Sequence, residues 1–335
     1  MILVTGGTGL VGSHLLYKLV SDNKKVRAIY RNEQKLKHTK NVFACYTNDF
    51  ETLFNAIDWV KADILDITEL DIAFKNITYV YHCAAFVSFE PNKYKQLRKI
   101  NIEGTANIVN FCLSHNIKKL CYVSSIATLG KELHDGFITE ASIWNPEDDN
   151  NVYAITKYGA EMEVWRATQE GLNAVIVNPG VIIGAGIWNY GTGSLFKKAK
   201  KGFKYFTSGT IGLVGIEDVV SAMIALTNSD NINNRYVLVA ENWTYKQFLQ
   251  TLSESVKSKK PEKLASSKML YFAWKLDWIN HKITGKRRLL TKHIAKSLTT
   301  ETYYSSSKIL KELEFNFHPL DETIKKVANL YLKQA

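Results

Sequence analysis

Short apolar runs alternate with longer amphipathic ones over the first 180 residues of the chain. The apolar runs are ILVT (2–5), KVRAIY (25–30), IDWVKAD (57–63), TYVYHCA (78–84), KKLCYVSS (118–125) and NAVIVNP (173–179). Each is rich in β-branched or aromatic residues and has the length of a strand. Between them lie helix candidates such as 9–22, with Leu15, Leu16 and Leu19 on an apolar face, and 92–116. Nearly all-apolar strands that alternate with helices indicate a parallel sheet covered on both faces.

The pattern loosens after residue 180. Glycines cluster in 180–193, and then 212–226 and 234–241 predict a helix and a strand that rejoin the sheet. From 243 onward the pattern is mainly helical and polar, with aromatics in MLYFAWKLDWI (269–279). We therefore predict an α/β fold with a doubly wound parallel sheet in residues 1–180, rejoined by 211–240. A smaller, mainly helical substrate-binding domain takes 181–210 and 241–335. Residues 37–55 interrupt the rhythm and are predicted to be an insertion.

Composition excludes several classes of protein. The chain has 335 residues, of which 46% are hydrophobic and 22% charged, as in ordinary soluble domains. Its longest apolar stretches fall short of the ~20 residues of a membrane span. It enters a strand-like run at once, so we expect no cleaved signal peptide. Its four cysteines are Cys45, Cys83, Cys112 and Cys121, without Cys-x-x-Cys spacing. We expect buried thiols, no metal site and a cytoplasmic location.

The net charge of +11 comes from 36 Lys and 7 Arg against 32 acidic residues. A lysine-rich surface with scattered acids is usually solvated surface. The runs KKAKKGFK (197–204) and GKRR (285–288) would also suit an acidic substrate or an anionic membrane surface. No nucleic-acid-binding motif accompanies the charge. We therefore expect a small-molecule substrate, no nucleic acid and no association with a membrane surface, and the sequence leaves the oligomeric state open, a homodimer included.

A glycine-rich loop follows the first strand directly. Gly7, Gly9 and Gly12 form Gly-x-Gly-x-x-Gly at the mouth of a helix, and Gly6 adds a Gly-x-x-Gly-x-x-Gly pattern. Only glycine allows so tight a turn and so close an approach to a pyrophosphate, for which the helix N-terminus supplies amide donors. The strand and helix on either side distinguish such a site from an ordinary turn. We predict a Rossmann-type fold whose dinucleotide contacts are Gly6, Gly7, Thr8, Gly9, Leu10, Val11 and Gly12.

The spacing Tyr-x-x-x-Lys occurs three times, at Tyr153/Lys157, Tyr271/Lys275 and Tyr304/Lys308. With 17 Tyr and 36 Lys in the chain, chance alone predicts about two such pairs. A phenol with a pKa of about 10 can transfer protons near neutral pH when a lysine ammonium favours the phenolate. The first pair lies on a predicted helix between two strands, near Ser124 and Ser125 at the carboxyl edge of the sheet, where such sheets bind ligands. The other two pairs have no such neighbours and are predicted to be surface or packing residues.

Seven motifs occur in order over the first 185 residues: TGGTGLVG (5–12), ADILD (62–66), VYHCAA (80–85), NIEGT (101–105), VSSIATLG (123–130), YAITK (153–157) and NPGVIIG (178–184). In these motifs the chain resembles an extended short-chain dehydrogenase/reductase of the NAD(P)-dependent epimerase/dehydratase superfamily. The resemblance implies an NAD(P)-dependent oxidoreductase. It makes Ser125 the substrate-orienting serine, Tyr153 the acid/base and Lys157 the lysine that binds the cofactor ribose.

The same resemblance implies further cofactor contacts. Asp63 and Ile64 would lie near the adenine, Ala84 and Ala85 would line the cofactor, and Pro179 and Val181 would flank the nicotinamide. Ser124 and Gly180 complete this set of expected contacts. Asn101 belongs to the asparagine-containing helix motif of the family, and a helix-packing amide is the alternative role for it.

The branch of the family is indicated by two departures. Nucleotide-sugar enzymes tend to carry an Arg-Asp-aromatic run before Val-x-Asp, whereas this chain has IGLVGIEDVV (211–220). NPGVIIGAG is similar to the Pro-Gly version of dihydroflavonol reductases, cinnamoyl-CoA reductases and hydroxysteroid dehydrogenases. We predict reduction of a ketone or aldehyde on a small apolar or aromatic substrate, contacted by Ser125 and by the aromatic residues Phe86, Phe89, Trp188 and Tyr190. Simple packing is the alternative for each aromatic residue.

Two other functions remain open on the sequence. One is a nucleotide-sugar epimerase or dehydratase that retains NAD through its cycle. The other is a non-catalytic, dinucleotide-sensing scaffold, against which the presence of both Tyr153 and Lys157 argues.

The end of the second strand bears on the choice of cofactor. An acidic residue there would bind both ribose hydroxyls and repel a 2′-phosphate. Here the strand is predicted to end at Tyr30, followed by Arg31 and Lys35, which suit a phosphate. Glu33 could instead hold an NAD ribose, but we place it in the next helical turn, where an acid is favoured anyway. We predict NADP, with NAD as the alternative and a solvated surface charge as the other role for Arg31.

Residues 260–299 are predicted to cap the substrate cleft. Tyr271, Phe272, Trp274, Trp278 and Ile279 fit a helix with an apolar side, and its flanks carry Lys and Arg. Packing of this helix on its own small domain is the ordinary alternative, and attachment to a membrane surface through it is the third.

Overall fold

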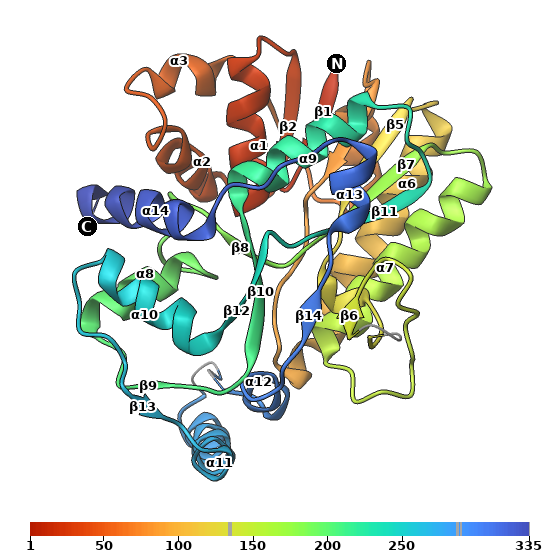
Figure 1. The fold of residues 1–335 in the computed structure, drawn as a ribbon. Coiled ribbons are helices and arrows are strands. Elements are labelled where there is room, and N and C mark those ends of the chain that lie inside the picture. The colour runs from red at the N-terminus through yellow and green to blue at the C-terminus, as the bar shows by residue number, and fades with distance from the viewer. Residues whose placement is uncertain (133–135, 286–287, 289, 335) are drawn as a thin grey trace.

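Seven parallel strands form the central sheet of the computed structural model, which describes residues 1–132, 136–285, 288 and 290–334 (Figure 1). Their order is β11-β7-β5-β4-β1-β2-β3, and every neighbouring pair is parallel. The strands are β1 (Ile2–Thr5), β2 (Val26–Tyr30), β3 (Asp58–Lys61), β4 (Tyr79–His82), β5 (Lys119–Val123), β7 (Ala174–Pro179) and β11 (Asn234–Leu238). The strand order reverses between β1 and β4, which confirms the predicted doubly wound, Rossmann-type sheet.

Helices cover both faces of this sheet because successive side chains of each strand point to opposite faces. Val4 faces one core cluster and Leu3 the other. The Val4 side is covered by α1 (Leu10–Ser21), α2 (Leu36–Phe43), α3 (Phe50–Asn55) and α9 (Ile216–Asn228). The Leu3 side is covered by α4 (Ile67–Phe74), α6 (Gly104–Ser114) and α7 (Val152–Gln169). The nearly all-apolar strands thus have the double burial that their sequences predict.

Residues 37–55 are not an insertion, and this expectation was wrong. They form most of the crossover from β2 to β3, and Val42, Phe43 and Phe54 are buried in the core on the Val4 side. The apolar positions are divided between two short helices, α2 and α3, so no single helical period runs through the segment. Because the helical period of apolar residues is broken between α2 and α3, the sequence pattern wrongly indicated an insertion.

A smaller domain is built on a second sheet of three strands. β10 (Thr210–Gly215) pairs in parallel with β8 (Val181–Ile183) and antiparallel with β12 (Glu241–Thr244). α8 (Gly193–Lys201), α10 (Tyr245–Ser255) and α14 (Leu320–Gln334) supply its core. Of residues 211–240, β11 therefore lies at the edge of the central sheet, whereas β10 lies in the second sheet.

The remaining elements lie mainly at the lower end of the molecule in Figure 1. β9 (Tyr205–Phe206) pairs with β13 (Lys263–Leu264), and β6 (Phe137–Ile138) pairs with β14 (Tyr303–Tyr304). α11 (Ser267–Thr284) and α12 (Lys292–Ser297) share a small cluster of their own, and α13 (Ser307–Glu312) packs against β11. Within the described residues, we find no helix with the length and apolarity to cross a bilayer.

Candidate active site

The glycine loop is shaped by close contacts that exclude side chains. Gly6 has a φ of +68°, and a Cβ atom there would lie 2.6 Å from the backbone nitrogen of Ala84. A Cβ atom at Gly12 would collide with the carbonyl of Gly6. Gly9 is the N-cap of α1, and among the described residues no side chain caps this helix and its first turn carries no acid. The N-terminus of α1 therefore fits the pyrophosphate of a dinucleotide.

A buried polar chain fixes the backbone at residues 83–85 against this loop. Thr5 Oγ1 accepts a hydrogen bond from the Ala84 amide at 3.2 Å and lies 2.6 Å from Nδ1 of His82. The other ring nitrogen of His82 lies 2.9 Å from the hydroxyl of Thr105. Burial lowers the pKa of His82 to about 3, so the ring is neutral. The side chains of β1, β4 and α6 thus hold the expected cofactor wall in place.

Tyr153 lies in the first turn of α7, which Asn151 begins by accepting a hydrogen bond from the Ala154 amide. Ser125 caps the 3-10 turn η4 (Ile126–Thr128) after β5, and its side chain lies near enough to the phenol of Tyr153 to influence the pKa of that group. Burial raises the pKa of Tyr153, and Ser125 opposes this shift only in part. The structure therefore brings Ser125 and Tyr153 together at the carboxyl edge of the sheet, with the phenol protonated at neutral pH.

Lys157 lies one turn further along α7, and its side chain is only 1% exposed. Its Nζ donates to the hydroxyl of Tyr122 at 2.6 Å and to the carbonyl of Val123 at 2.7 Å. Burial lowers the pKa of Lys157 to about 7, although the charge of Glu161 and the thiol of Cys83 raise it. Our expectation that this ammonium lowers the pKa of Tyr153 is not met in this structure, because Nζ is engaged by Tyr122 and Val123.

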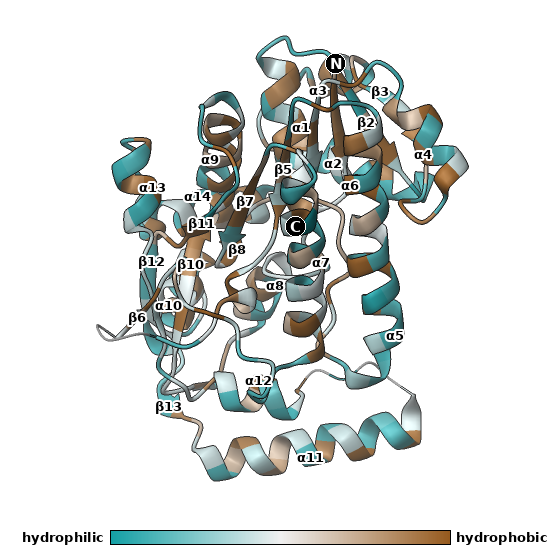
Figure 2. Ribbon diagram, turned by 90° about the vertical axis from the view of Figure 1, so that its right-hand side faces the viewer, coloured by the Kyte–Doolittle hydropathy of each residue, from teal (hydrophilic) through white to brown (hydrophobic). Residues whose placement is uncertain are grey.

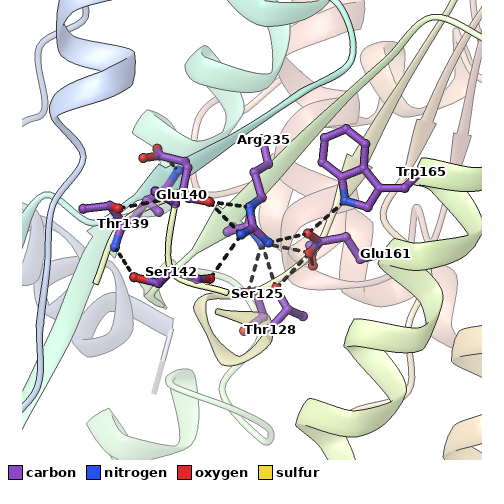
Figure 3. A network of polar contacts seen from close by, with 12 residues as sticks. Ser125, Thr128, Thr139, Glu140, Ser142, Glu161, Trp165 and Arg235 are labelled. Atoms are coloured by element: carbon purple, nitrogen blue, oxygen red, sulfur yellow. Dashed lines mark hydrogen bonds and ion pairs between the residues drawn. The ribbon is translucent and has the colours of Figure 1, made fainter. Parts of the chain in front are cut away.

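Glu161, one further turn along the same helix, anchors a buried network behind the site (Figure 3). One carboxylate oxygen accepts hydrogen bonds from Ser124, Thr128 and Asn178 at 2.6, 2.8 and 3.0 Å. The other pairs with Arg235 at 3.1 Å. Arg235 in turn donates to the carbonyls of Glu140 and Ser142. The network ties α7 to the loop that carries Ser125 and to β7 and β11.

The same network determines where the side chain of Ser124 points and how the backbone of Ser125 is held. The hydroxyl of Ser124 is directed to Glu161, and its amide donates to the carbonyl of Val177. Ser124 is therefore placed beside the site with its side chain already bound. Asn178 Nδ2 donates to the carbonyl of Ser125 and the hydroxyl of Thr128. Asn178, in β7, thus holds the backbone of Ser125 in place.

Asn101 lies in η3 (Arg98–Glu103), a stretch of π-helix that joins α5 (Tyr94–Leu97) to α6. Its Oδ1 accepts from the amide of Phe86, and its Nδ2 donates to the carbonyl of Phe86 and to Thr156. The side chain thus clamps the loop after β4 onto α7. Its contacts are those of a packing amide that shapes the site.

The junction of β7 and β8 carries Pro179, Gly180 and Val181 from the central sheet into the second sheet. The amide of Gly180 donates to the carbonyl of Leu238, and a Cβ atom at Gly180 would lie 2.5 Å from the carbonyl of Gly212. Only glycine fits this crossing, which places the three residues at the carboxyl edge of the sheet where the nicotinamide is expected.

The ends of β2 and β3 hold the residues expected at the adenosine end of the cofactor. Arg31 and Lys35 are exposed, and Arg31 lies 3.5 Å from a carboxylate oxygen of Asp63. Glu33 begins the 3-10 turn η1 (Glu33–Lys35), after the end of β2 at Tyr30. Ile64 packs against Gly104 in the core, and its carbonyl accepts a hydrogen bond from Asn107.

The aromatic residues predicted to contact the substrate lie in different surroundings. The ring of Phe89 meets the ring of Tyr153 edge-on at 5.4 Å, and Phe86 is held by Asn101 on the same loop. Trp188 packs against Phe196 and Tyr331 in the core of the second domain. Tyr190 is 55% exposed and contacts the ring of His38. Of these aromatic residues, Phe89 contacts Tyr153, and the described contacts of Trp188 and Tyr190 lie away from it.

The other two Tyr-x-x-x-Lys pairs make different contacts. Lys275 stacks over the ring of Tyr271 at 4.3 Å on the exposed helix α11. Lys308 donates to Asn234 and lies over the ring of Tyr236, and Tyr304 belongs to the two-residue strand β14.

The sequence pattern did not identify three residues of the site. Glu161 follows Lys157 by four residues and Tyr153 by eight, so the helical period that pairs those two also predicts its position. Tyr122 lies three residues before Ser125, inside a strand, where nothing in the pattern distinguishes it from core. His38 contacts the ring of Tyr190 and lies near the backbone of Thr8 in the glycine loop, and only the fold reveals these contacts between distant segments. Among the described residues, no group of His, Cys, Asp and Glu is arranged to hold a metal ion.

Known proteins resemble this chain in sequence and in fold. The sequence model described as the NAD dependent epimerase/dehydratase family matches residues 2–239. A putative dihydroflavonol 4-reductase of Synechocystis sp. is 28% identical over 92% of this chain and 88% of its own length. A UDP-glucose 4-epimerase of Vibrio cholerae is 28% identical over 72% of this chain and 70% of its own.

The fold is shared with solved structures of low identity. The UDP-glucose 4-epimerase of Thermotoga maritima, solved with UDP-glucose, superposes with a TM-score of 0.76 at 19% identity, over 99% of each chain. Because the family model covers well over half of the chain, the assignment rests on the sequence match and is consistent with the glycine loop and the proximity of Ser125 and Tyr153. The chain belongs to the NAD dependent epimerase/dehydratase family and is an NAD(P)-dependent enzyme of the extended short-chain dehydrogenase/reductase type.

Proposed function

We propose that this enzyme reduces a ketone or aldehyde on a small apolar or aromatic molecule with NADP(H), and that Tyr153 is its proton donor. The observation that carries the proposal is the phenol of Tyr153, which lies beside Ser125 and Phe89 and whose pKa is raised by burial, so that it is protonated at neutral pH. A carbonyl oxygen that becomes an alkoxide needs such a donor at its side. When bound, the nicotinamide supplies the hydride.

Ser125 and Tyr153 act on the same oxygen in this proposal. Ser125 is fixed through its backbone by Asn178 and Thr128 and through its side chain by the Ala127 amide. Its hydroxyl orients the carbonyl oxygen, and the phenol of Tyr153 transfers its proton there as charge develops. The phenylalanine ring of Phe89 against Tyr153 supplies an apolar wall on this side.

Lys157 supports this proton transfer from a buried position one helical turn after Tyr153. Its Nζ is 2.6 Å from the hydroxyl of Tyr122, and both groups are buried. As the resemblance implies, Lys157 binds a cofactor ribose from this position. A pKa of about 7 allows the lysine to gain or lose a proton near neutral pH.

The residues at the adenosine end support NADP over NAD. Arg31 follows β2 directly, and its side chain is 57% exposed, so the guanidinium is available to a 2′-phosphate. Glu33 begins the turn beyond the strand end rather than occupying that end. Arg31 lies 3.5 Å from Asp63, a residue expected near the adenine.

Two observations favour a reductase over a nucleotide-sugar enzyme. The Synechocystis relative named as a putative dihydroflavonol 4-reductase aligns over 92% of the chain, against 72% for the Vibrio cholerae epimerase. The segment before Asp218, where nucleotide-sugar enzymes tend to carry an arginine, consists here of buried Leu213, Val214 and Ile216. Asp218 itself is bound by the amide and ring of His318.

Cofactor consumption distinguishes the two functions. Purified enzyme is incubated with NADPH and a panel of aromatic and alicyclic ketones and aldehydes, and separately with UDP- and dTDP-sugars and NAD. We expect stoichiometric loss of NADPH absorbance with at least one carbonyl compound, absent in Tyr153→Phe and retained in Tyr271→Phe. Conversion of a sugar nucleotide without net consumption of cofactor would overturn the proposal.

A further inference from the structure

α11 is an 18-residue helix that leaves one whole side uncovered. Leu270 is its one buried residue among those described, and it packs with Ala295 and with the partly buried Trp274. At 100° per residue, five large apolar side chains fall within an arc of about 80° on the opposite side. They are Met269, Phe272, Leu276, Ile279 and Ile283, and Phe272, Leu276 and Ile283 are 63%, 66% and 79% exposed. We call these five residues the outer stripe.

Basic and aromatic residues border the outer stripe along one edge. Lys268, Lys275 and Lys282 recur every seven residues and are exposed. Lys275 lies over the ring of Tyr271 at 4.3 Å and Lys282 over that of Trp278 at 5.8 Å. This edge therefore combines positive charge with aromatic rings that have both an apolar body and a polar tip.

The single acidic residue of α11 lies on its inner side. Asp277 pairs with Arg288 at 3.3 Å and is 16% exposed, so its charge is directed toward the protein. The surface that α11 presents to solvent is therefore apolar and positive. Figure 2 shows α11 along the lower edge of the molecule, beyond α12 and the two domains.

We propose, against the expectation drawn from the composition of the chain, that α11 docks flat on the surface of a bilayer that contains anionic lipid. A contiguous apolar stripe on a protein surface marks an interaction site, and a helix with such a stripe beside a row of lysines lies in the plane of the interface. Headgroups with negative charge match Lys268, Lys275 and Lys282, and tyrosine and tryptophan are enriched at that depth. A second copy of the chain would present the same lysines and no outward acid.

Docking in this manner would set the active site beside the lipid. The amide of Arg288, after α11, donates to Glu90, and the neighbouring Phe89 contacts Tyr153. His293 and Lys296 of α12 bond to Asp149, two residues before the N-cap of α7. The segment from α11 to α12 is thus fastened to both loops around Tyr153. Resting on the proposed function, this places the substrate among carbonyl compounds that partition into lipid.

Vesicle flotation tests the docking without any assay of activity. Full-length protein is mixed with vesicles of phosphatidylcholine alone or with a third of phosphatidylglycerol and centrifuged through a density gradient. We expect the protein to float with the anionic vesicles and to remain at the bottom with phosphatidylcholine alone. Lys268→Gln/Lys275→Gln/Lys282→Gln should weaken binding about 100-fold, because each lysine near an anionic surface contributes about 1 kcal/mol.

Matched variants distinguish the outer stripe from general charge. Leu276→Gln/Ile279→Gln/Ile283→Gln should abolish flotation with an unchanged Tm, because these side chains are exposed and glutamine is a good helix former. The control Lys24→Gln/Lys25→Gln/Lys75→Gln removes the same charge from exposed turns at the amino edge of the central sheet and should float as the wild type does.

Two outcomes overturn the proposal. One is wild-type protein that stays at the bottom with anionic vesicles. The other is a dimer, measured by light scattering, that the Leu276→Gln/Ile279→Gln/Ile283→Gln variant converts to a monomer, since the outer stripe would then bind a second copy. Flotation of the inactive variant Tyr153→Phe keeps this result separate from the proposed reaction.

Discussion

α7 and α11 are both 18 residues long, and both contain Tyr-x-x-x-Lys. In α7, Lys157 is buried and bonded to Tyr122 and Val123, and Glu161 continues the same face into a network of hydrogen bonds. In α11, Lys275 is exposed beside Tyr271, on the edge of an apolar surface. The comparison teaches that the spacing only places two side chains on one face. What surrounds that face decides whether the pair can do proton chemistry.

The largest effect is expected where the α7 network is broken. Glu161→Ala leaves Arg235 without its carboxylate and removes an acceptor of Ser124, Thr128, Asn178 and Trp165. Loss of one partner of a buried ion pair costs about 3–5 kcal/mol of unfolding free energy. Urea denaturation measures this loss, and turnover should fall as well because the backbone of Ser125 is held by the same network.

Glu163→Ala is the control on the same helix. Glu163 pairs with Arg166 at the surface, where such pairs contribute about 0–1 kcal/mol. Equal destabilisation by the two variants would show that α7 has no privileged buried face and would remove the basis of the comparison.

Tyr153→Phe removes the transferable proton and keeps the ring. Turnover should fall about 100-fold or more, whereas the affinity for the cofactor should change little. Tyr271→Phe on α11 should leave turnover unchanged, since its hydroxyl lies on the exposed edge of that helix. Steady-state rates of both variants check this directly. An active Tyr153→Phe enzyme would contradict the assignment of α7 as the catalytic helix.

Much of the candidate site around α7 could be predicted from the sequence, because residues close in the chain determine which side chains share a strand end or a helix face. The glycine loop, Ser125, Tyr153 and Lys157 each follow a strand or share a helix face, so period and strand order place them together. The covered sheet followed in the same way from its apolar strands. Residues 37–55 were misread because two short helices carry one apolar face between them.

The direction in which polar groups point was not predictable in this manner. Lys157 was expected to act on Tyr153, but the fold brings Tyr122 from β5 to within 2.6 Å of its Nζ. Ser124 was expected among the cofactor contacts, yet its hydroxyl is bound by Glu161. Both outcomes depend on contacts between segments 35 or more residues apart. In the basic run 285–288, Lys286 and Arg287 lie outside the described residues.

Lys157→Met should change how stability depends on pH. The lysine has a pKa of about 10.4 in an unfolded chain and about 7 in the folded one, where burial lowers it and Glu161 and Cys83 oppose the shift. Between these values the unfolded state binds more protons, so this lysine makes stability rise with pH. The Tm of the variant minus that of the wild type should therefore be highest at pH 7 and decline toward pH 10. A flat difference for Lys157→Met would contradict the burial of its charge.

The smallest effect concerns an exposed cation whose partner arrives with the cofactor. Arg31 is as open to solvent as the lysines of α11, and its nearest acid is Asp63 at 3.5 Å. Without a ligand it should contribute almost nothing to stability, because exposed pairs are screened by water. With a 2′-phosphate it can form two charge-assisted hydrogen bonds, so Arg31→Ala should weaken NADP binding about 10-fold and leave NAD binding within about 2-fold. Dissociation constants for both cofactors, with Arg98→Ala as an exposed-arginine control, check this. Equal wild-type affinity for NADP and NAD would contradict the assignment of Arg31 to the 2′-phosphate. Exposure of a charged side chain at the end of β2 or on α11 indicates a binding site only when a partner of matching charge binds there.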